Sequence, residues 1–385
     1  MMDSFEGYLG PVAAGIAPEL ISPSAFADIR SVARVLPDTL AYNTFGFECR
    51  LGEELPRADF LVLATASCGR ESLAGLHPTS TLPDFLTADP IWKRVAGFAA
   101  RWADPSSVLY YAADNVWLEF DVDGTVPDVP VPSVFFGPQA NGRVDTGVAT
   151  HGQNAEDERA TIVNALRLLS GVEPPPRMLQ TMSDCLRALS PDESVFQVGL
   201  MMSRSTEAVR LCIRLGTVGR VAEYLSGVGW TGSEVDLRDT LEPVSGLVNY
   251  VCLDVDVGES VHPKVGLECY VGRPGSPKSG PEWEAFLDFL LRRGLCTPDK
   301  REALLAYPGY IDENAEGVPW PAPLRRASLL LGGRSLSMFV RAIHHVKIVY
   351  RPGEPPEAKA YLAANHHWYS PAKAAGTARR ESART

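Results

Sequence analysis

Several features that would mark a particular class of protein are missing from this sequence. No apolar run approaches the roughly 20 residues that a membrane-spanning helix needs. The first residues, MMDSFEGYLGPVAAGIAPEL, carry acids where a signal peptide requires bases. The 7 cysteines are scattered and form no CxxC pair, which argues against a disulfide framework and against structural zinc. These absences predict a soluble protein of the cytoplasm with reduced thiols.

Motifs of familiar cofactor and catalytic sites are missing as well. The sequence contains no P-loop, no GxGxxG, no EF-hand loop, no GxSxG nucleophile elbow and no Asp-rich helix pair of the metal-dependent terpene synthases. We therefore expect the protein to work without a cofactor and without a bound metal. Its net charge of −11 argues against duplex nucleic acid and anionic membranes as partners, although a local basic cavity is compatible with it.

What the sequence does contain is a repeated strand pattern. The 31 prolines and 33 glycines indicate many turns and favour a strand-rich fold over a helical bundle. Five pairs of strand-like runs are separated by short turns. They are 44–51 with 59–67, 115–122 with 132–137, 195–202 with 208–215, 250–257 with 264–271, and the two arms of 340–368.

Segments with helical periodicity separate these pairs. We expect helices at 24–35, 80–103, 155–170, 177–189, 218–228, 283–293 and 298–306. Pro298 suits the first position of the last helix, with Thr297 as its N-cap. The Pro/Gly-rich stretch 309–334 is expected to be a long ordered loop or a lid.

Hairpins keep their strands antiparallel, and ten such strands would leave two exposed edges unless the sheet closed on itself. We therefore predict an α+β fold: five repeated ββ hairpins with intervening helices, forming a closed ten-stranded antiparallel barrel surrounded by helices. Residues 1–43 would be a loose lead-in segment, 44–370 the barrel, and 371–385 a disordered tail. Two separate α+β domains that divide near residues 171–177 are the alternative.

The last hairpin carries the clearest candidate site. Because alternate side chains of a strand share a face, His345 and Lys347 should lie on one side of the first arm, and Lys359 and Tyr361 on one side of the second. Two lysines and a tyrosine on one face suit a phosphate or diphosphate, although a solvated outer face has the same composition. His345 is a candidate acid or base. We expect the adjacent residues His344 and His345 to point to opposite faces, and therefore not to chelate a metal as a unit.

Repeated ββ units with outer helices around a central cavity resemble the barrel of the aromatic prenyltransferases, a group that includes the dimethylallyltryptophan synthases and peptide prenyltransferases. The resemblance is one of strand and helix order over residues 44–368. It implies that inward Arg, Lys and Tyr side chains hold an allylic diphosphate without magnesium, and that an inward acid orients the acceptor. The residues here that are similar to the diphosphate-binding set are Arg50, Arg210, Arg214, Tyr270, Lys347, Lys359 and Tyr361. Glu48 and Glu119 are similar to the acid.

Alternating acids on other strands depart from that pattern. They are Glu119, Asp121 and Asp123 on the second pair, and Asp254, Asp256 and Glu268 on the fourth. If these side chains point inward, the cavity is more acidic than a diphosphate site should be. Three other interpretations stay open: the acids mark the solvent-facing or helix-facing side, recognise a cationic substrate, or bind a metal.

The function we predict is metal-independent transfer of a prenyl group from an allylic diphosphate to a small aromatic or peptide acceptor inside the barrel. Two alternatives stay open. The first is a barrel without catalytic activity that binds a peptide or a partner protein through its acidic strands. The second is a peptide-modifying lyase that acts on phosphorylated residues and uses the same Lys and Arg side chains as an anion site.

Overall fold

The computed structural model describes residues 4–122, 124, 126–138, 155–204, 207–272, 280–332 and 334–370. Ten antiparallel strands close into a barrel, as the hairpin pattern predicted. Closure is made by β11, which pairs with β1 on one side and with β10 on the other. Among the described residues, no helix is long and apolar enough to cross a membrane.

The strands follow one another around the barrel nearly in chain order, and a short strand, β9, is added at one end of β10. The strands are β1 (Phe45–Arg50), β2 (Ala58–Thr65), β3 (Ala113–Phe120), β4 (Ser133–Pro138), β5 (Ser194–Leu200), β6 (Val209–Gly216), β7 (Tyr250–Val257), β8 (Val261–Tyr270), β9 (Gly309–Asp312), β10 (Leu336–Tyr350) and β11 (Glu357–Tyr369).

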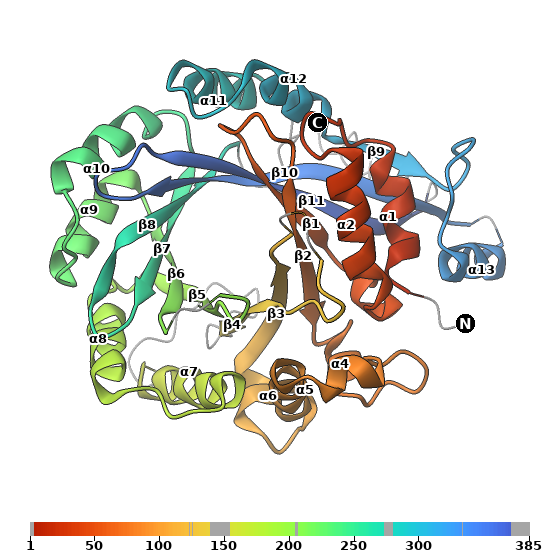
Figure 1. Cartoon of the computed structure of the whole chain (residues 1–385), viewed down its shortest axis with the longest axis horizontal. Coiled ribbons are helices and arrows are strands. Elements are labelled where there is room, and N and C mark those ends of the chain that lie inside the picture. The colour runs from red at the N-terminus through yellow and green to blue at the C-terminus, as the bar shows by residue number, and fades with distance from the viewer. Residues whose placement is uncertain are drawn as a thin grey trace, which may run out of the picture.

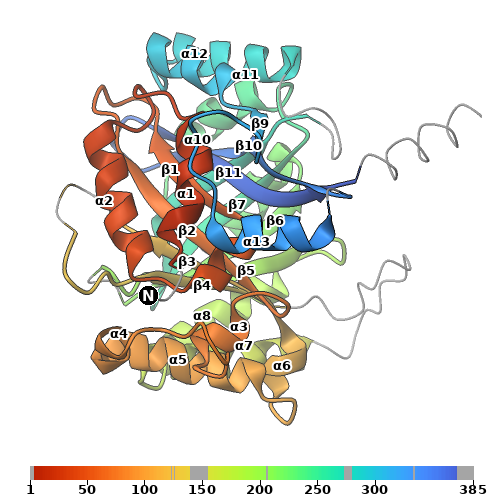
Figure 2. The ribbon, with the colours of Figure 1, turned by 90° about the vertical axis from the view of Figure 1, so that its right-hand side faces the viewer.

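The helices lie outside the ring of strands, as the view along the barrel in Figure 1 and the side view in Figure 2 show. They are α1 (Glu6–Ala13), α2 (Pro23–Arg34), α3 (Arg70–Leu73), α4 (Asp84–Ala88), α5 (Pro90–Ala103), α6 (Val108–Ala112), α7 (Ala155–Ser170), α8 (Pro176–Arg187), α9 (Val218–Gly227), α10 (Glu234–Leu241), α11 (Pro281–Arg292), α12 (Pro298–Ala306) and α13 (Ala322–Leu331). Two 3₁₀ turns, η1 (Asp38–Tyr42) and η2 (Glu242–Val244), complete the described elements.

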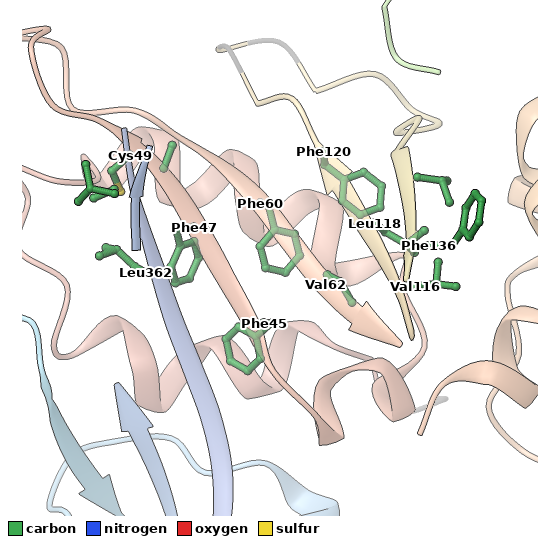
Figure 3. Close-up of a cluster of buried hydrophobic side chains, with 14 of the residues drawn as sticks. Phe45, Phe47, Cys49, Phe60, Val62, Val116, Leu118, Phe120, Phe136 and Leu362 are labelled. Atoms are coloured by element: carbon green, nitrogen blue, oxygen red, sulfur yellow. The ribbon is translucent and has the colours of Figure 1, made fainter. Parts of the chain in front are cut away.

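The apolar core lies between the outer face of the strands and the helices. Phe45 and Phe47 of β1, Phe60 of β2 and Phe120 of β3 are buried there, in the row of side chains drawn in Figure 3. Trp92 of α5 stacks on Phe120 with ring centroids 6.3 Å apart. Successive side chains of a strand point to opposite faces. Because these aromatic rings are buried on the outer face of the barrel, under the helices, the polar residues between them point into the barrel.

Residues 4–43 form part of this core. Phe5, next to α1, is fully buried and makes edge-on contacts with Phe45 and Phe60 at centroid distances of 5.2 and 5.4 Å. The expected helix at 24–35 is present as α2, and α1 precedes it. The segment that we expected to be a loose lead-in therefore covers part of the barrel wall.

Two local predictions were wrong, and two others lie outside the described residues. The single helix expected at 80–103 is divided into α4 and α5, because Asp89 caps a new helix through the amides of Ile91 and Trp92 and Pro90 occupies its first turn. The stretch 309–334, expected to be a loop or lid, contains β9 and α13. The expected tail 371–385 and Asp123 are not among the described residues.

The predicted start of α12 is confirmed, and it allows a test of stability. The Thr297 hydroxyl accepts a hydrogen bond from the amide of Lys300 at 3.4 Å. Replacing Thr297 with alanine should lower the free energy of unfolding by about 1 kcal/mol, because a helix N-terminal amide loses its acceptor. Urea denaturation would measure this change, and Thr297→Ser is the matched control because serine keeps the hydroxyl. Equal losses in both variants would contradict the capping role.

Candidate functional site

Two adjoining cavities occupy the barrel interior. One is polar, and the lining residues of the other include six Phe, Trp and Tyr side chains. Glu119, Lys347 and Tyr361 line both and therefore mark their junction. The charged lining of the polar cavity comprises Glu48, Glu119, Arg204, Arg210, Asp254, Asp256, Lys264, Lys347, Arg351 and Lys359. The polar faces of the strands thus point inward, including the acidic faces of β3, β7 and β8.

Lys347 of β10 is the central cation of this site. Its ammonium lies 2.7 Å from Asp254 Oδ2 and 3.7 Å from Glu268 Oε1, and it sits over the ring of Tyr361 at 4.8 Å from the centroid. Burial acts to lower the pKa of Lys347, but Asp254 and the other carboxylates outweigh it and raise that pKa well above its usual range. The ammonium therefore remains charged. Gly266 makes room for it, since a β-carbon there would lie 3.1 Å from Asp254 and 3.3 Å from Lys347.

Glu48 of β1 joins two of the predicted residues of β11. Lys359 Nζ donates to Glu48 Oε1 at 2.5 Å, and the Tyr361 hydroxyl donates to Glu48 Oε2. Burial acts to raise the pKa of Glu48, but Lys359 and Lys347 outweigh it and hold that pKa well below its usual range. Glu48 is thus an ionised acceptor that fixes the positions of Lys359 and Tyr361.

The far side of the polar cavity is formed by β6, β7 and β8. Arg210 makes a two-pronged contact with Asp256 at 2.8 and 3.1 Å, which holds the guanidinium plane in place. Lys264 lies 4.0 Å from Asp256, and burial together with the nearby Arg210 cation lowers the pKa of Lys264 to about 8. Lys264 was not predicted as a site residue, although it shares the alternate positions of Glu268 and Tyr270 on β8.

Glu119 differs from the other carboxyl groups of the cavity. Burial raises its pKa to about 8, against the opposing effect of Lys347. Glu119 is therefore mostly protonated at pH 7 and carries little charge. Six cationic side chains and four carboxyl groups line the polar cavity, so a neutral Glu119 leaves an excess of positive charge there.

The other cavity, called the aromatic cavity below, is bounded by side chains from several strands. Tyr270 of β8 donates its hydroxyl to Glu268 at 2.9 Å, and its ring stacks on Tyr250 with centroids 4.3 Å apart. The lining of the aromatic cavity includes Trp117, Glu119, Phe135, Phe196, Gln197, Glu268, Tyr270, His344, His345, Lys347 and Tyr361. A flat aromatic molecule with one polar group matches this composition.

The prediction that His344 and His345 point to opposite faces was wrong. The pairing of β10 with β11 shifts register between Ile343 and His345, which is a β-bulge. A bulge interrupts the alternation of side chains, so both imidazoles line the aromatic cavity. Their Nδ1 atoms are 2.7 Å apart, and His345 also stacks on Tyr361 with centroids 4.2 Å apart.

Two predicted cations lie away from the polar cavity. Arg50 points inward at the end of β1, but its guanidinium binds Asp59 at 3.0 Å and does not line either cavity. Arg214 lies over the ring of Phe196 at 5.6 Å, beside the aromatic cavity. Within the described part of the chain, no group of three or more His, Cys, Asp and Glu residues could hold a metal ion, and this includes Asp254, Asp256 and Glu268.

The fold is similar to that of solved prenyltransferases. PriB in a binary complex with product diphosphate matches with a TM-score of 0.50 and 15% identity over 94% of each chain. Apo PriB matches with a TM-score of 0.49 and 15% identity over 94% of each chain. The 5-dimethylallyl tryptophan synthase from Streptomyces coelicolor, in complex with DMASPP and Trp, matches with a TM-score of 0.43 and 17% identity over 93% of each chain. No family model and no curated protein matches the sequence. At these identities the likeness is one of fold: the chain has the helix-covered, ten-stranded barrel of the aromatic prenyltransferases.

Proposed function

We propose that the protein transfers a prenyl group from an allylic diphosphate to an aromatic acceptor, either a small molecule or a peptide side chain, without a metal ion. The observation that carries this proposal is the junction of the two cavities. A cavity with excess positive charge adjoins one lined by aromatic rings, and Lys347, Tyr361 and Glu119 belong to both. A substrate with an anionic head and an apolar tail would span this junction.

The diphosphate would lie in the polar cavity. Lys347, Lys359 and Arg210 are held by Asp254, Glu48 and Asp256, so their positions are fixed before a ligand arrives. As the carbon–oxygen bond breaks, negative charge grows on the leaving diphosphate, and fixed cations at that place lower the barrier. PriB, whose fold the chain shares at a TM-score of 0.50, has been solved with product diphosphate.

The allyl group would lie at the junction, where aromatic faces stabilise a carbocation. The rings of Tyr361 and Tyr270 flank His345, at centroid distances of 4.2 and 5.1 Å. The negative faces of such rings attract a cation through their quadrupole. Walls that exclude water would also keep it from quenching the cation before the acceptor attacks.

The acceptor would stack in the aromatic cavity, and His345 would take its proton. His345 is buried, and its Nε2 has no hydrogen-bond partner. Burial lowers the pKa of His345 well below its usual range, so the imidazole is neutral and can accept a proton. Glu119, being mostly protonated at pH 7, would donate a hydrogen bond to a polar group of the acceptor or donor.

A second candidate function is the binding of a basic peptide without chemistry. It is favoured by Asp254, Asp256 and Glu268, which point into the barrel. Such a complex would weaken as salt screens its charges. A complex whose affinity is the same at low and high salt would count against this candidate.

Isothermal titration with dimethylallyl and geranyl diphosphate, with and without magnesium, tests the proposal. We expect micromolar binding that does not require magnesium, because Lys and Arg side chains supply the positive charge. An acceptor screen with tryptophan, tyrosine and peptides that contain them would follow. Absence of binding under both conditions would overturn the proposal and favour the peptide-binding candidate.

A further inference from the structure

The β-bulge in β10 places two imidazoles side by side at the aromatic cavity, one buried and one exposed. His345 is 5% exposed, whereas its neighbour His344 is exposed at the cavity. Their Nδ1 atoms lie 2.7 Å apart, the distance of a hydrogen bond in which one nitrogen carries the proton. The other nitrogen of His345, Nε2, is buried, without a hydrogen-bond partner, and 3.7 Å from Glu268 Oε1.

These positions are compatible with an arrangement of protons that leaves His345 able to act as a base. If Nδ1 of His345 donates to Nδ1 of His344, Nε2 of His345 keeps its lone pair and can accept a proton inside the cavity. Several ionisable groups influence His345 from the elements packed around it. They are Glu48 on β1, Asp254 on β7, Glu268 and Tyr270 on β8, His344 and Lys347 on β10, and Tyr361 on β11.

We infer that His345 and His344 form a two-imidazole relay that carries a proton from the aromatic cavity to solvent. The relay rests on the proposed function, because prenyl transfer to an aromatic acceptor releases a proton. The low basicity of the buried His345 favours this role, since a weak base passes its proton on to an exposed neighbour instead of retaining it. His345 would be the catalytic base, and His344 would act through it.

The proton and electron count of the step is balanced. The allylic carbon–oxygen bond breaks, and its electron pair leaves with the diphosphate. A new bond forms between the allylic carbon and the acceptor atom, which uses an electron pair of the acceptor. The proton on that acceptor atom moves to Nε2 of His345. The Nδ1 proton of His345 moves to Nδ1 of His344, and His344 then loses its Nε2 proton to water. Water that enters as the products leave restores the starting tautomers.

Kinetics of three histidine variants test the relay once an acceptor is known. Replacing His345 with alanine should lower kcat about 100-fold, the range of general base catalysis. His344→Ala should lower kcat about tenfold and leave the KM for the allylic diphosphate unchanged, and added imidazole should restore the rate. His367→Ala, at an exposed histidine of β11, is the control and should keep full activity. A His344→Ala enzyme with wild-type kcat at every pH would overturn the relay.

Nuclear magnetic resonance of protein labelled with ¹⁵N-histidine tests the relay independently of activity. We expect one proton shared between the two Nδ1 atoms, lost in both His344→Ala and His345→Ala, and a bare Nε2 in His345 at pH 7. A proton found on Nε2 of His345 would overturn the relay, because that nitrogen would then be unable to accept another. Failure of prenyl transfer with every acceptor would instead overturn the proposed function. The spectrum would still show whether the two imidazoles share a proton and whether Nε2 of His345 is free of one.

Discussion

Replacing Lys347 with methionine is expected to lower the affinity for dimethylallyl diphosphate about 30-fold or more. Lys347 is the one cation at the junction of the two cavities among the described lining residues, and its ammonium is buried beside Asp254 and Glu268. Loss of one partner from a buried charged contact costs about 2–5 kcal/mol in binding, which corresponds to a factor of 30 or more. The remaining Asp254 and Glu268 would repel the diphosphate. Isothermal titration at pH 7 measures the change.

Two further variants separate binding from folding in this experiment. Lys347→Met also leaves Asp254 without its cation, which destabilises the protein by about 3 kcal/mol or more. Combining Lys347→Met with Asp254→Asn removes that unpaired charge and should recover most of the stability while diphosphate affinity stays low. Arg214→Ala is the matched control, because Arg214 lies over Phe196 and outside the polar cavity. Unchanged affinity in folded Lys347→Met protein would show that the polar cavity is not the diphosphate site.

Raising the pH from 7 to 9.5 is expected to weaken diphosphate binding about 100-fold, because two groups near the ligand each become more negative by one unit charge. The pKa of Glu119 is about 8, so this carboxyl is neutral below that pH and negative above it. The pKa of Lys264 is also about 8, so this ammonium is positive below that pH and neutral above it. Both changes make the net charge of the cavity less positive as the pH rises. The charge of the diphosphate changes little over this range, because the last pKa of a phosphate ester is about 6 and its ionisation is nearly complete at pH 7.

A double variant provides the control for this pH dependence. Glu119→Gln cannot gain a negative charge, and Lys264→Arg keeps its positive charge throughout the range. Together they should reduce the change in affinity between pH 7 and 9.5 to less than about tenfold. Titration in buffers of different ionisation enthalpy should also show proton uptake on binding near pH 8 in the wild type and much less in the double variant. An identical pH profile in both proteins would contradict the assignment of the two groups.

Much of the architecture followed from the sequence because its signals are local. Each barrel hairpin has two apolar, β-branched runs around a turn, and the helices that were predicted have a periodic apolar stripe, so the ten barrel strands and six of the thirteen described helices were found within a few residues. The closure of the sheet into a barrel was predicted because an open sheet would leave two edge strands unpaired. Local signals were weak where Pro90 begins a second helix, and in 309–334, where β9 and α13 are short and surrounded by turns.

The candidate site was predictable as a set of residues but not as an arrangement. Alternation placed Lys347, Lys359 and Tyr361 on common faces of β10 and β11, yet the same alternation allows either face of a strand to point inward. Burial of Phe45, Phe60 and Phe120 under the helices decides this choice and turns Glu48 and Glu119 into the barrel.

The class of fold, the succession of barrel hairpins and five of the ten charged residues that line the polar cavity could be predicted from the amino-acid sequence alone. The tertiary structure was needed to show which of those charges meet, because Lys347 contacts Asp254 across strands that are far apart in the chain. It also decided that His344 and His345 touch, because the register shift in β10 depends on pairing with β11 and not on the residues of β10 alone. Strand pairing is a contact between distant segments, and its register is set by the packing of the whole barrel.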